Sequence, residues 1–241
     1  TAIVTGANTG IGQAIALSLA AAGADIAAVG RTPAQETVEK VRALGRQAQI
    51  VSADLSSIEP VQRVVDETLE KLGRLDILVN NAGIIRRADS VDFTEEDWDA
   101  VIDTNLKTTF FLCQAAGRHM LAQGAGKIIN IASLLSFQGG IRVPSYTASK
   151  SGVAGLTKLL ANEWAARGVN VNAIAPGYIA TNNTAALQAD ETRNRQIQER
   201  IPAGRWGDPA DIGGAAVFLA SSAADYIHGH TLAVDGGWLA R

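Results

Sequence analysis

A phenol and an ammonium group stand four residues apart in the segment Ser-Tyr-Thr-Ala-Ser-Lys, which ends at Lys150. Residues at this spacing share one face of a helix, so Tyr146 and Lys150 are placed to interact. A free phenol has a pKa near ~10, which is too high for efficient proton transfer at neutral pH, and a neighbouring cation lowers it. The pair therefore predicts a proton-transfer site, with Tyr146 as the acid and Lys150 adjusting its pKa.

A half-exposed helix with a solvated lysine would explain an isolated Tyr-x-x-x-Lys equally well, because short matches are frequent by chance. A glycine-rich segment at 5–12, Thr-Gly-Ala-Asn-Thr-Gly-Ile-Gly, argues against that alternative. It follows an apolar run and precedes a proline-free apolar stretch, so it joins a predicted strand to a predicted helix. A turn of this kind binds a pyrophosphate at the helix N-terminus, where free N–H groups and the helix dipole favour anions. A structural turn would explain the glycines alone, but this context favours a nucleotide.

A third segment, Ile-Ile-Asn-Ile-Ala-Ser, is an apolar strand that ends at the hydroxyl of Ser133. Alone, this serine would be typical of a turn or a helix cap. Together with Asn-Asn-Ala-Gly at 80–83, Asn105 and Pro176-Gly177, however, the three segments resemble the short-chain dehydrogenase/reductase family over the whole chain. The resemblance implies an enzyme that transfers a hydride between a nicotinamide cofactor and a CH–OH or ketone carbon.

The resemblance also implies roles for the matching residues. Ser133 would hold the substrate oxygen, Tyr146 would exchange its proton, and Lys150 would contact the nicotinamide ribose as well as the phenol. Asn105 would fix a water that links Lys150 to solvent, and its alternative role is a helix amide bonded to nearby backbone. The implied cofactor-binding residues are Gly6, Asn8, Thr9, Gly10, Ile11, Asp54, Leu55, Asn81, Ala82, Gly83, Pro176, Gly177, Ile179 and Thr181, with Tyr146 and Lys150.

Cofactor preference depends on the end of the second predicted strand, which reads Ala-Val-Gly-Arg. A carboxylate there would accept hydrogen bonds from both ribose hydroxyls of NAD and repel a 2′-phosphate. Gly30 takes that acidic position, and Arg31 beside it can pair with a phosphate. We therefore expect NADP to be favoured over NAD; the alternative is that Arg31 is only an exposed loop cation.

Arginines flank the expected reaction centre on two loops. Arg86 and Arg87 follow the Asn-Asn-Ala-Gly motif, while Gln138 and Arg142 lie between the strand-end serine and the tyrosine. An anionic substrate follows, with its carboxylate gripped by Arg142 or Arg86 and with Gln138 nearby. Of these, Arg142 is the preferred ligand, whose alternative role is to tether its own loop, and Arg87 is interpreted as a solvated surface residue.

Three further segments, at 136–146, 201–207 and 235–241, resemble the branch of the family that oxidises and reduces sugar acids of the gluconate and 3-deoxy-gluconate type. Two alternatives stay open. A 3-oxoacyl-carrier-protein reductase would need a basic face for its acidic partner, and the arginines of this chain are too scattered to show one. A non-catalytic NAD(P)-binding regulator would be expected to lose part of the catalytic set, which is complete here.

The composition adds exclusions. The formal net charge of -3 and the absence of long runs of like charge suggest neither nucleic acid nor an anionic membrane as a partner. The three histidines form no ligand spacing, so we expect no metal. The single cysteine, Cys113, lies in an apolar helical stretch and is expected to be a buried, inert thiol. A cytoplasmic location fits these features best.

The elements that must position these residues follow from the alternation of short apolar runs with longer helical patterns, which is typical of a parallel sheet. We predict a single-domain Rossmann fold over residues 1–241, with a doubly wound, seven-stranded parallel sheet and helices on both faces. The polar segment 178–205 is interpreted as a mobile helical lid over the substrate, and the family resemblance implies a homotetramer. The predicted strands are 1–5, 24–30, 47–52, 76–79, 127–132, 170–175 and 231–234, and the predicted helices are 10–22, 33–44, 58–72, 95–123, 146–167 and 209–221.

Overall fold

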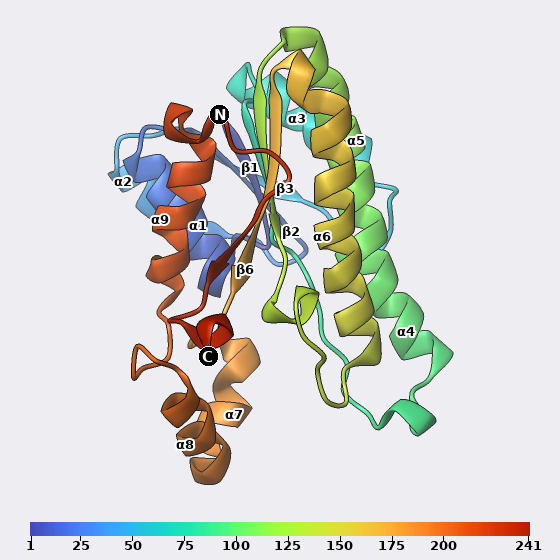
Figure 1. Cartoon of the computed structure of the whole chain (residues 1–241). Helices are drawn as coiled ribbons and strands as arrows, with labels where there is room; N and C mark the ends of the chain where they lie inside the picture. Colours follow the sequence, from blue (N-terminus) through green and yellow to red (C-terminus); the bar gives the residue numbers. More distant parts are fainter.

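Seven parallel strands form one sheet in the order β3-β2-β1-β4-β5-β6-β7 in the computed structural model, which describes residues 1–241 (Figure 1). The central strands are buried on both faces, which is why they read as nearly continuous apolar runs. The predicted fold class and strands are confirmed. The strands are β1 Ala2–Thr5, β2 Ile26–Gly30, β3 Ala48–Ser52, β4 Ile77–Asn80, β5 Gly126–Ile131, β6 Val169–Pro176 and β7 Thr231–Val234.

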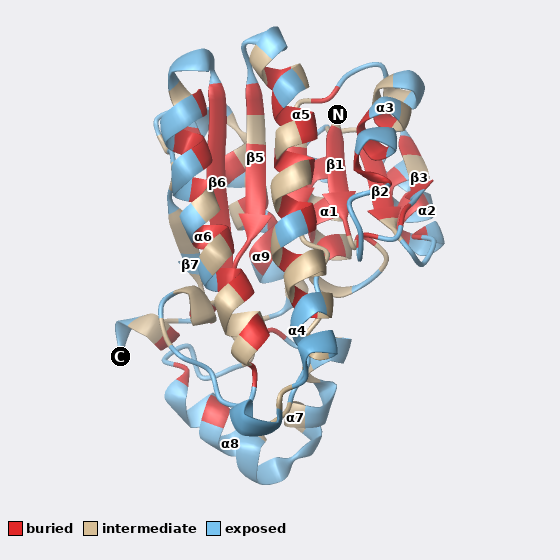
Figure 2. Ribbon diagram, turned by 90° about the vertical axis from the view of Figure 1, so that its right-hand side faces the viewer, coloured by how far each residue is buried: buried red, intermediate tan, exposed pale blue.

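Helices cover both faces of the sheet (Figure 1). On one face lie α1 (Gly10–Ala21), α2 (Gln35–Ala43) and α9 (Pro209–Ala220), and on the other lie α3 (Val61–Leu72), α5 (Thr108–Gln123) and α6 (Pro144–Trp164). Each layer has its own core of 22 buried hydrophobic residues, so both faces are packed to a similar extent. Figure 2 shows the same arrangement, with buried strands between helices whose outer sides are exposed.

The helix predicted at 95–123 is not continuous. It consists of α4 (Glu95–Ile102), a π-helical segment (Asp103–Lys107) and α5. The π-helical segment contains Asn105, whose side chain bonds to the backbone of Ile84 on a different segment. Widened turns of this kind are often found at functional sites. The periodicity of the sequence does not reveal this interruption, because the apolar pattern continues through it.

The strand order reverses between β1 and β4, and in open α/β sheets the crevice at such a point, at the carboxyl ends of the strands, binds ligands. The segment 178–205 lies beyond this edge of the sheet (Figure 1). As predicted, it is helical, with α7 at Ala185–Ala189 and α8 at Glu191–Arg200, and Figure 2 shows both helices largely exposed. No helix of the chain has the length and apolar character that crossing a bilayer requires.

Candidate active site

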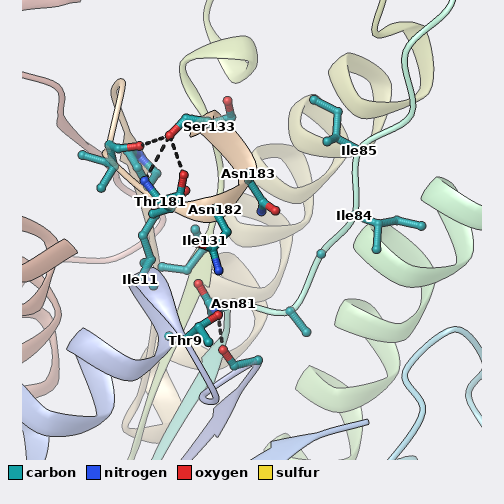
Figure 3. Close-up of a pocket in the computed structure, with 18 of the residues that line it drawn as sticks. Thr9, Ile11, Asn81, Ile84, Ile85, Ile131, Ser133, Thr181, Asn182 and Asn183 are labelled. Atoms are coloured by element: carbon teal, nitrogen blue, oxygen red, sulfur yellow. Dashed lines mark hydrogen bonds between the residues drawn. The ribbon is translucent and has the colours of Figure 1, made fainter. Parts of the chain in front are cut away.

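One cavity of about 560 Å³ lies at the carboxyl edge of the sheet, beside the point where β1 meets β4. In Figure 3, Ile84 and Ile85 lie on one side of it, and Thr181, Asn182 and Asn183 lie on the other. The structure thus brings together most of the site residues predicted from the sequence. Those that line the cavity are Gly6, Asn8, Thr9, Gly10, Ile11, Arg31, Asn81, Ala82, Gly83, Ser133, Tyr146, Lys150, Pro176, Gly177, Ile179 and Thr181.

The glycine turn is open to an anion. A Cβ atom on Gly12 would collide with the carbonyl group of Gly6, so the close approach of turn and helix requires glycine. The side chain of Thr9, the N-cap of α1, makes no capping hydrogen bond, and no acidic residue occupies the first turn of the helix. The first-turn N–H groups therefore have no side-chain partner. A phosphate group fits this end of the cavity in both space and charge.

Tyr146 and Lys150 occupy the first turns of α6, which Pro144 opens at a position where a missing N–H costs nothing. The Lys150 side chain is buried, and its Nζ donates a 2.6 Å hydrogen bond to the Ile131 carbonyl oxygen at the end of β5. The Lys150 Nζ lies 5.6 Å from the centre of the Tyr146 ring. The two residues therefore face the cavity from one side of the helix, as the spacing predicts.

The pKa values of this pair differ from the expectation. Burial raises the pKa of Tyr146, while a hydrogen bond with the Ser133 side chain and the charge of Arg87 act in the opposite direction. The sequence predicts that Lys150 lowers this pKa, but in the structure the groups that lower it are Ser133 and Arg87. Burial also lowers the pKa of Lys150 itself, from 10.5 to about 8, because a desolvated ammonium group is costly.

Asn105 does not line the cavity but holds one of its walls. Its side-chain oxygen accepts a 2.8 Å hydrogen bond from the Ile84 N–H, and its Nδ2 donates a 2.9 Å bond to the Ile84 carbonyl oxygen. Nδ2 also lies 3.4 Å from Ser149 Oγ on α6. The arrangement corresponds to the alternative role, an amide bonded to backbone, although that backbone lies 21 residues away in sequence.

The arginines near the cavity are arranged differently from the prediction. Arg142, the preferred carboxylate ligand, and Arg86 do not line the cavity. Arg142 Nε lies 3.0 Å from Asp89, and Arg86 Nε lies 3.1 Å from Asp97, so each guanidinium is paired with a carboxylate.

Gln138 is also outside the cavity and accepts a hydrogen bond from Trp238. Arg87, which the sequence suggested was merely solvated, lines the cavity and makes no hydrogen bond or ion pair. Arg87 is thus the arginine on these loops that is available to a ligand.

The residues expected at the adenosine end fall into two groups. Arg31 lines the cavity at the end of β2, is 79% exposed, and lies 3.9 Å from the Asp54 carboxylate. Asp54 is outside the cavity, and hydrogen bonds from Ser56, the backbone bond first, keep the pKa of its carboxyl below the ordinary value. Leu55 is buried in the core against α3. Arg31 is therefore largely exposed to solvent at this end of the cavity.

Several cavity residues were not singled out from the sequence. The loops after β4 and β6 carry most of them, and their position directly after predicted strands is the signal that could have identified them. Thr184 has a structural role as well, since its hydroxyl accepts a hydrogen bond from Thr181 N–H and donates one to the Ile179 carbonyl. The additional lining residues are Ile84, Ile85, Arg87, Ile131, Ala132, Asn182, Asn183 and Thr184.

We predict that Lys150→Met raises the free energy of unfolding at pH 7 by up to about 3 kcal/mol, because the shift from 10.5 to about 8 is a cost of burying the ammonium group. Below pH 8 this cost is fully present. Between pH 8 and pH 10.5 the unfolded chain binds more protons than the folded one, so the stability of the unmodified protein rises with pH and the advantage of the variant shrinks.

Urea unfolding at pH 7 and at pH 10 measures this difference. Lys158→Met is the matched control, since Lys158 is exposed on the same helix and its replacement should change stability by less than about 0.5 kcal/mol. Equal stability of Lys150→Met and the unmodified protein at pH 7 would contradict a desolvation cost of the buried Lys150 ammonium group.

The chain is similar to proteins of known family. Residues 6–239 match the family profile described as enoyl-(acyl carrier protein) reductase. A 2-dehydro-3-deoxy-D-gluconate 5-dehydrogenase of Escherichia coli strain K12 is 60% identical over 241 residues, which is 100% of this chain and 95% of the relative.

Two solved structures are similar over the whole chain. The first, from Agrobacterium tumefaciens with bound NADP, is of a candidate 2-deoxy-D-gluconate 3-dehydrogenase; it is 62% identical, has a TM-score of 0.92, and the match covers 100% of this chain and 96% of that one. The second is a gluconate 5-dehydrogenase of Burkholderia cenocepacia in complex with NADP and tartrate, 40% identical over 100% of this chain and 95% of that one, with a TM-score of 0.94.

These matches extend over nearly the entire sequence, and the structure brings the glycine turn, the strand-end serine and the Tyr-x-x-x-Lys pair to one cavity. The chain belongs to the short-chain dehydrogenase/reductase family.

Proposed function

We propose that this protein is an NADP-dependent dehydrogenase that transfers a hydride between the cofactor and a secondary alcohol or ketone of a sugar acid, of the gluconate or 3-deoxy-gluconate type. The observation that carries the proposal is the single cavity that joins an anion-binding helix terminus to Ser133, Tyr146 and Lys150. The similarity to a 2-dehydro-3-deoxy-D-gluconate 5-dehydrogenase at 60% identity supports the substrate class.

The chain offers a matching group for each part of the cofactor. The first turn of α1 would hold the pyrophosphate, and Arg31, together with the absence of an acidic side chain at Gly30, would accept the 2′-phosphate. Asp54 and Leu55 would border the adenine. Lys150 would reach the ribose next to the nicotinamide, and Ile179 and Thr181 would contact the carboxamide end. NADP in two of the similar structures supports this assignment.

The bound cofactor would supply the hydride as NADPH or accept it as NADP⁺, and side chains of the protein transfer the proton. Ser133 donates a hydrogen bond to the substrate oxygen and so polarises the carbon that reacts. Tyr146 gives its phenolic proton to that oxygen during reduction and receives it back during oxidation. The charge of Arg87 favours the phenolate, which opposes the effect of burial on the Tyr146 pKa. Lys150, through its bond to Ile131, stays fixed beside the phenol.

Arg87 would bind the carboxylate of the substrate. It lines the cavity, its charge acts on Tyr146, and neither an aspartate nor a backbone oxygen occupies its guanidinium. A planar guanidinium can grip a carboxylate through two parallel hydrogen bonds and so fix which carbon faces the nicotinamide. Tartrate, a dicarboxylate, accompanies NADP in the similar gluconate 5-dehydrogenase structure, which agrees with an anion-binding site in that enzyme.

The segment 178–205, which we call the covering segment, would cover the substrate, since its first residues line the cavity and its helices lie beyond the sheet.

We also propose a cytoplasmic homotetramer with one catalytic domain per chain. The single cysteine, Cys113, is buried and unpaired, and its burial raises the pKa of the thiol to about 12, so it is an inert core residue as expected. The absence of a disulfide is usual for proteins of a reducing compartment.

We predict that Tyr146→Phe lowers turnover by about a hundred- to ten-thousand-fold and leaves NADPH affinity unchanged, because the ring stays and only the transferable proton is lost. Turnover with gluconate and 3-deoxy-gluconate type acids, with NADPH binding followed by fluorescence, tests this. Tyr226→Phe is the control, since Tyr226 is fully exposed. Retained turnover in Tyr146→Phe would contradict the mechanism, and turnover of a 3-oxoacyl thioester in place of sugar acids would favour the carrier-protein reductase.

For the cofactor, we predict that Arg31→Ala weakens NADPH binding by about ten- to a hundred-fold, as expected for loss of a charged hydrogen-bond partner, and spares NADH. Gly30→Asp should turn the preference toward NADH, because a carboxylate there repels the 2′-phosphate. The added side chain fits, since a Cβ on Gly30 would meet only the Thr32 carbonyl oxygen, at 3.6 Å. The ratio of kcat/KM for the two cofactors is the measurement, with exposed Arg118→Ala as control. A preference of the unmodified enzyme for NADH would rule out this role of Arg31.

For the substrate, we predict that Arg87→Ala raises the KM for a sugar acid by about ten-fold or more, the loss expected for a bidentate charged pair. The KM for a neutral polyol should change little. The pH profile of oxidation should also move to higher pH, because removal of the Arg87 charge raises the Tyr146 pKa. Arg86→Ala is the matched control, since Arg86 already pairs with Asp97. Equal losses on the acid and on the polyol would show that Arg87 does not bind the carboxylate.

A further inference from the structure

The side chain of Trp238 touches both the loop that carries Ser133 and the segment that covers the cavity. Trp238 begins a short 3₁₀ turn (η7, Trp238–Ala240) at the C-terminal end of the chain and is only 4% exposed. It forms a small buried cluster with Leu134, which follows Ser133, and with Ile197 and Ile201, which lie in and directly after α8. In Figure 1 the C-terminus lies beside α7 and α8, and Figure 2 shows it towards the same end of the molecule as these helices. Neither Trp238 nor its three partners in this cluster line the cavity.

On the side of the covering segment, the Trp238 indole contacts Arg200 and Tyr178. The guanidinium carbon of Arg200, the last residue of α8, lies 3.9 Å from the centre of the Trp238 ring, a cation–π distance. The ring of Tyr178, where the segment begins, lies 4.7 Å from the Trp238 ring, and Trp206, directly after the end of the segment, packs edge-on against Tyr178 at 5.5 Å. The two ends of the covering segment and its longer helix, α8, therefore pack against one aromatic cluster of Tyr178, Trp206 and Trp238.

On the side of the catalytic loop, the indole N–H of Trp238 donates a 3.3 Å hydrogen bond to the side-chain oxygen of Gln138. The loop between Ser133 and Gln138 is also fixed to α6, because Ser136 Oγ donates a 2.7 Å bond to the Lys150 carbonyl oxygen. Ser133 joins the end of β5 to this loop. A displacement of Leu134 or Gln138 would therefore also move Ser133.

In addition to these side-chain contacts, the backbone around Trp238 is fixed to the end of β7. The Asp235 carboxylate accepts hydrogen bonds of 2.8 and 2.9 Å from the backbone N–H groups of Gly237 and Leu239. The backbone of Gly237 is in the left-handed region, with φ 90°, which turns the chain so that the indole faces inward. A Cβ there would also lie 3.0 Å from Pro202, which follows the covering segment's helix closely. Asp235, directly after β7, and the close approach of Gly237 to Pro202 therefore both fix the backbone next to Trp238.

We propose that Trp238 is a positioning residue that couples the placement of Ser133 to the placement of the covering segment. A tryptophan suits this role because it is large, rigid and polar at one edge, so one side chain can stack on one partner and hydrogen-bond to another. The benefit lies in precision, since a shift of about 1 Å at a reacting group can cost about a hundred-fold in rate. This inference rests on the proposed function for its kinetic test.

Three variants separate the two contacts. Gln138→Ala removes the acceptor on the loop side and should lower kcat, because Ser133 loses its fixed position. Arg200→Ala removes the stacked cation on the other side and should raise the KM for the sugar acid. Trp238→Ala should do both and lower kcat/KM by about ten-fold or more, with NADPH affinity unchanged. Trp98→Ala is the matched control, since Trp98 lies on α4, away from the cluster, and is 40% exposed.

Coupling is tested by the double variant Gln138→Ala/Arg200→Ala, made both with Trp238 present and in the Trp238→Ala background. With Trp238 present, the effects of the two substitutions on kcat/KM should be non-additive, although no hydrogen bond joins the two side chains. In the Trp238→Ala background, each substitution should have little further effect. Additive effects with Trp238 present, or a Trp238→Ala variant that loses only thermal stability, would overturn the proposal. Should Trp238→Ala fail to fold, Trp238→Phe removes the hydrogen bond and keeps most of the ring.

A readout without substrate separates this inference from the proposed function. Arg193 and Arg195 on α8 are exposed, so trypsin can cleave there when the covering segment detaches. Trp238→Ala and Arg200→Ala should speed this cleavage several-fold, while Gln138→Ala and Trp98→Ala should not. Unchanged cleavage in Trp238→Ala would overturn the positioning role, whatever the substrate. Faster cleavage in an enzyme that turns over no sugar acid would support the positioning role and count against the proposed function.

Discussion

A hydrogen-bonded junction between the ends of β1 and β4 is the constraint on which the site depends. The Thr5 hydroxyl accepts hydrogen bonds of 2.9 Å from the backbone N–H groups of both Asn81 and Ala82. In return, the Asn81 side chain donates to the carbonyl oxygen atoms of Thr5 and Gly6 at 2.9 and 3.3 Å. The glycine turn and the loop after β4 are thereby fixed to each other. Because these contacts are short and partly buried, they tolerate little change in geometry.

The loop fixed at this junction carries the rest of the site with it. Two residues beyond Ala82, the backbone of Ile84 is held on both sides by Asn105 from the π-helical segment. Arg87 follows three residues later and lines the cavity. The reactive side chains come from other strands and helices, and Asn105 also links this loop to α6, because its Nδ2 lies 3.4 Å from Ser149 Oγ. A short-chain dehydrogenase can therefore combine a rigid cofactor end with a substrate end made of longer segments.

Two ionisable groups, Tyr146 and Lys150, are desolvated at the reactive centre, and this affects the free energy of folding. The Lys150 ammonium is buried with one hydrogen bond, to the Ile131 carbonyl oxygen, and no carboxylate neutralises it. The phenol of Tyr146 is likewise held in an environment that disfavours its charged form. Burial of the Lys150 ammonium group destabilises the folded protein at neutral pH, whereas the Tyr146 phenol, whose pKa is raised, is uncharged there and adds no such cost. Local stability is thus lower where the chemistry requires a buried ammonium group.

The sequence by itself determined the fold and identified the glycine turn, Ser133, Tyr146 and Lys150, which the structure brings to one cavity. Buried parallel strands leave continuous apolar runs, glycines mark backbone that must approach a phosphate, and helical spacing places Tyr146 and Lys150 together. These signals are local in the sequence, and the structure contains each feature that they predict. The tertiary structure decided which arginine is available, since the sequence favoured Arg142, whereas in the structure Arg142 pairs with Asp89 and Arg87 lines the cavity.

It also decided the direction of the Tyr146 pKa shift and the position of Trp238 between Ser133 and the covering segment. The physical reason is the same in each case. Desolvation and pairing depend on which atoms from distant parts of the chain share a space, and no spacing within one segment records that.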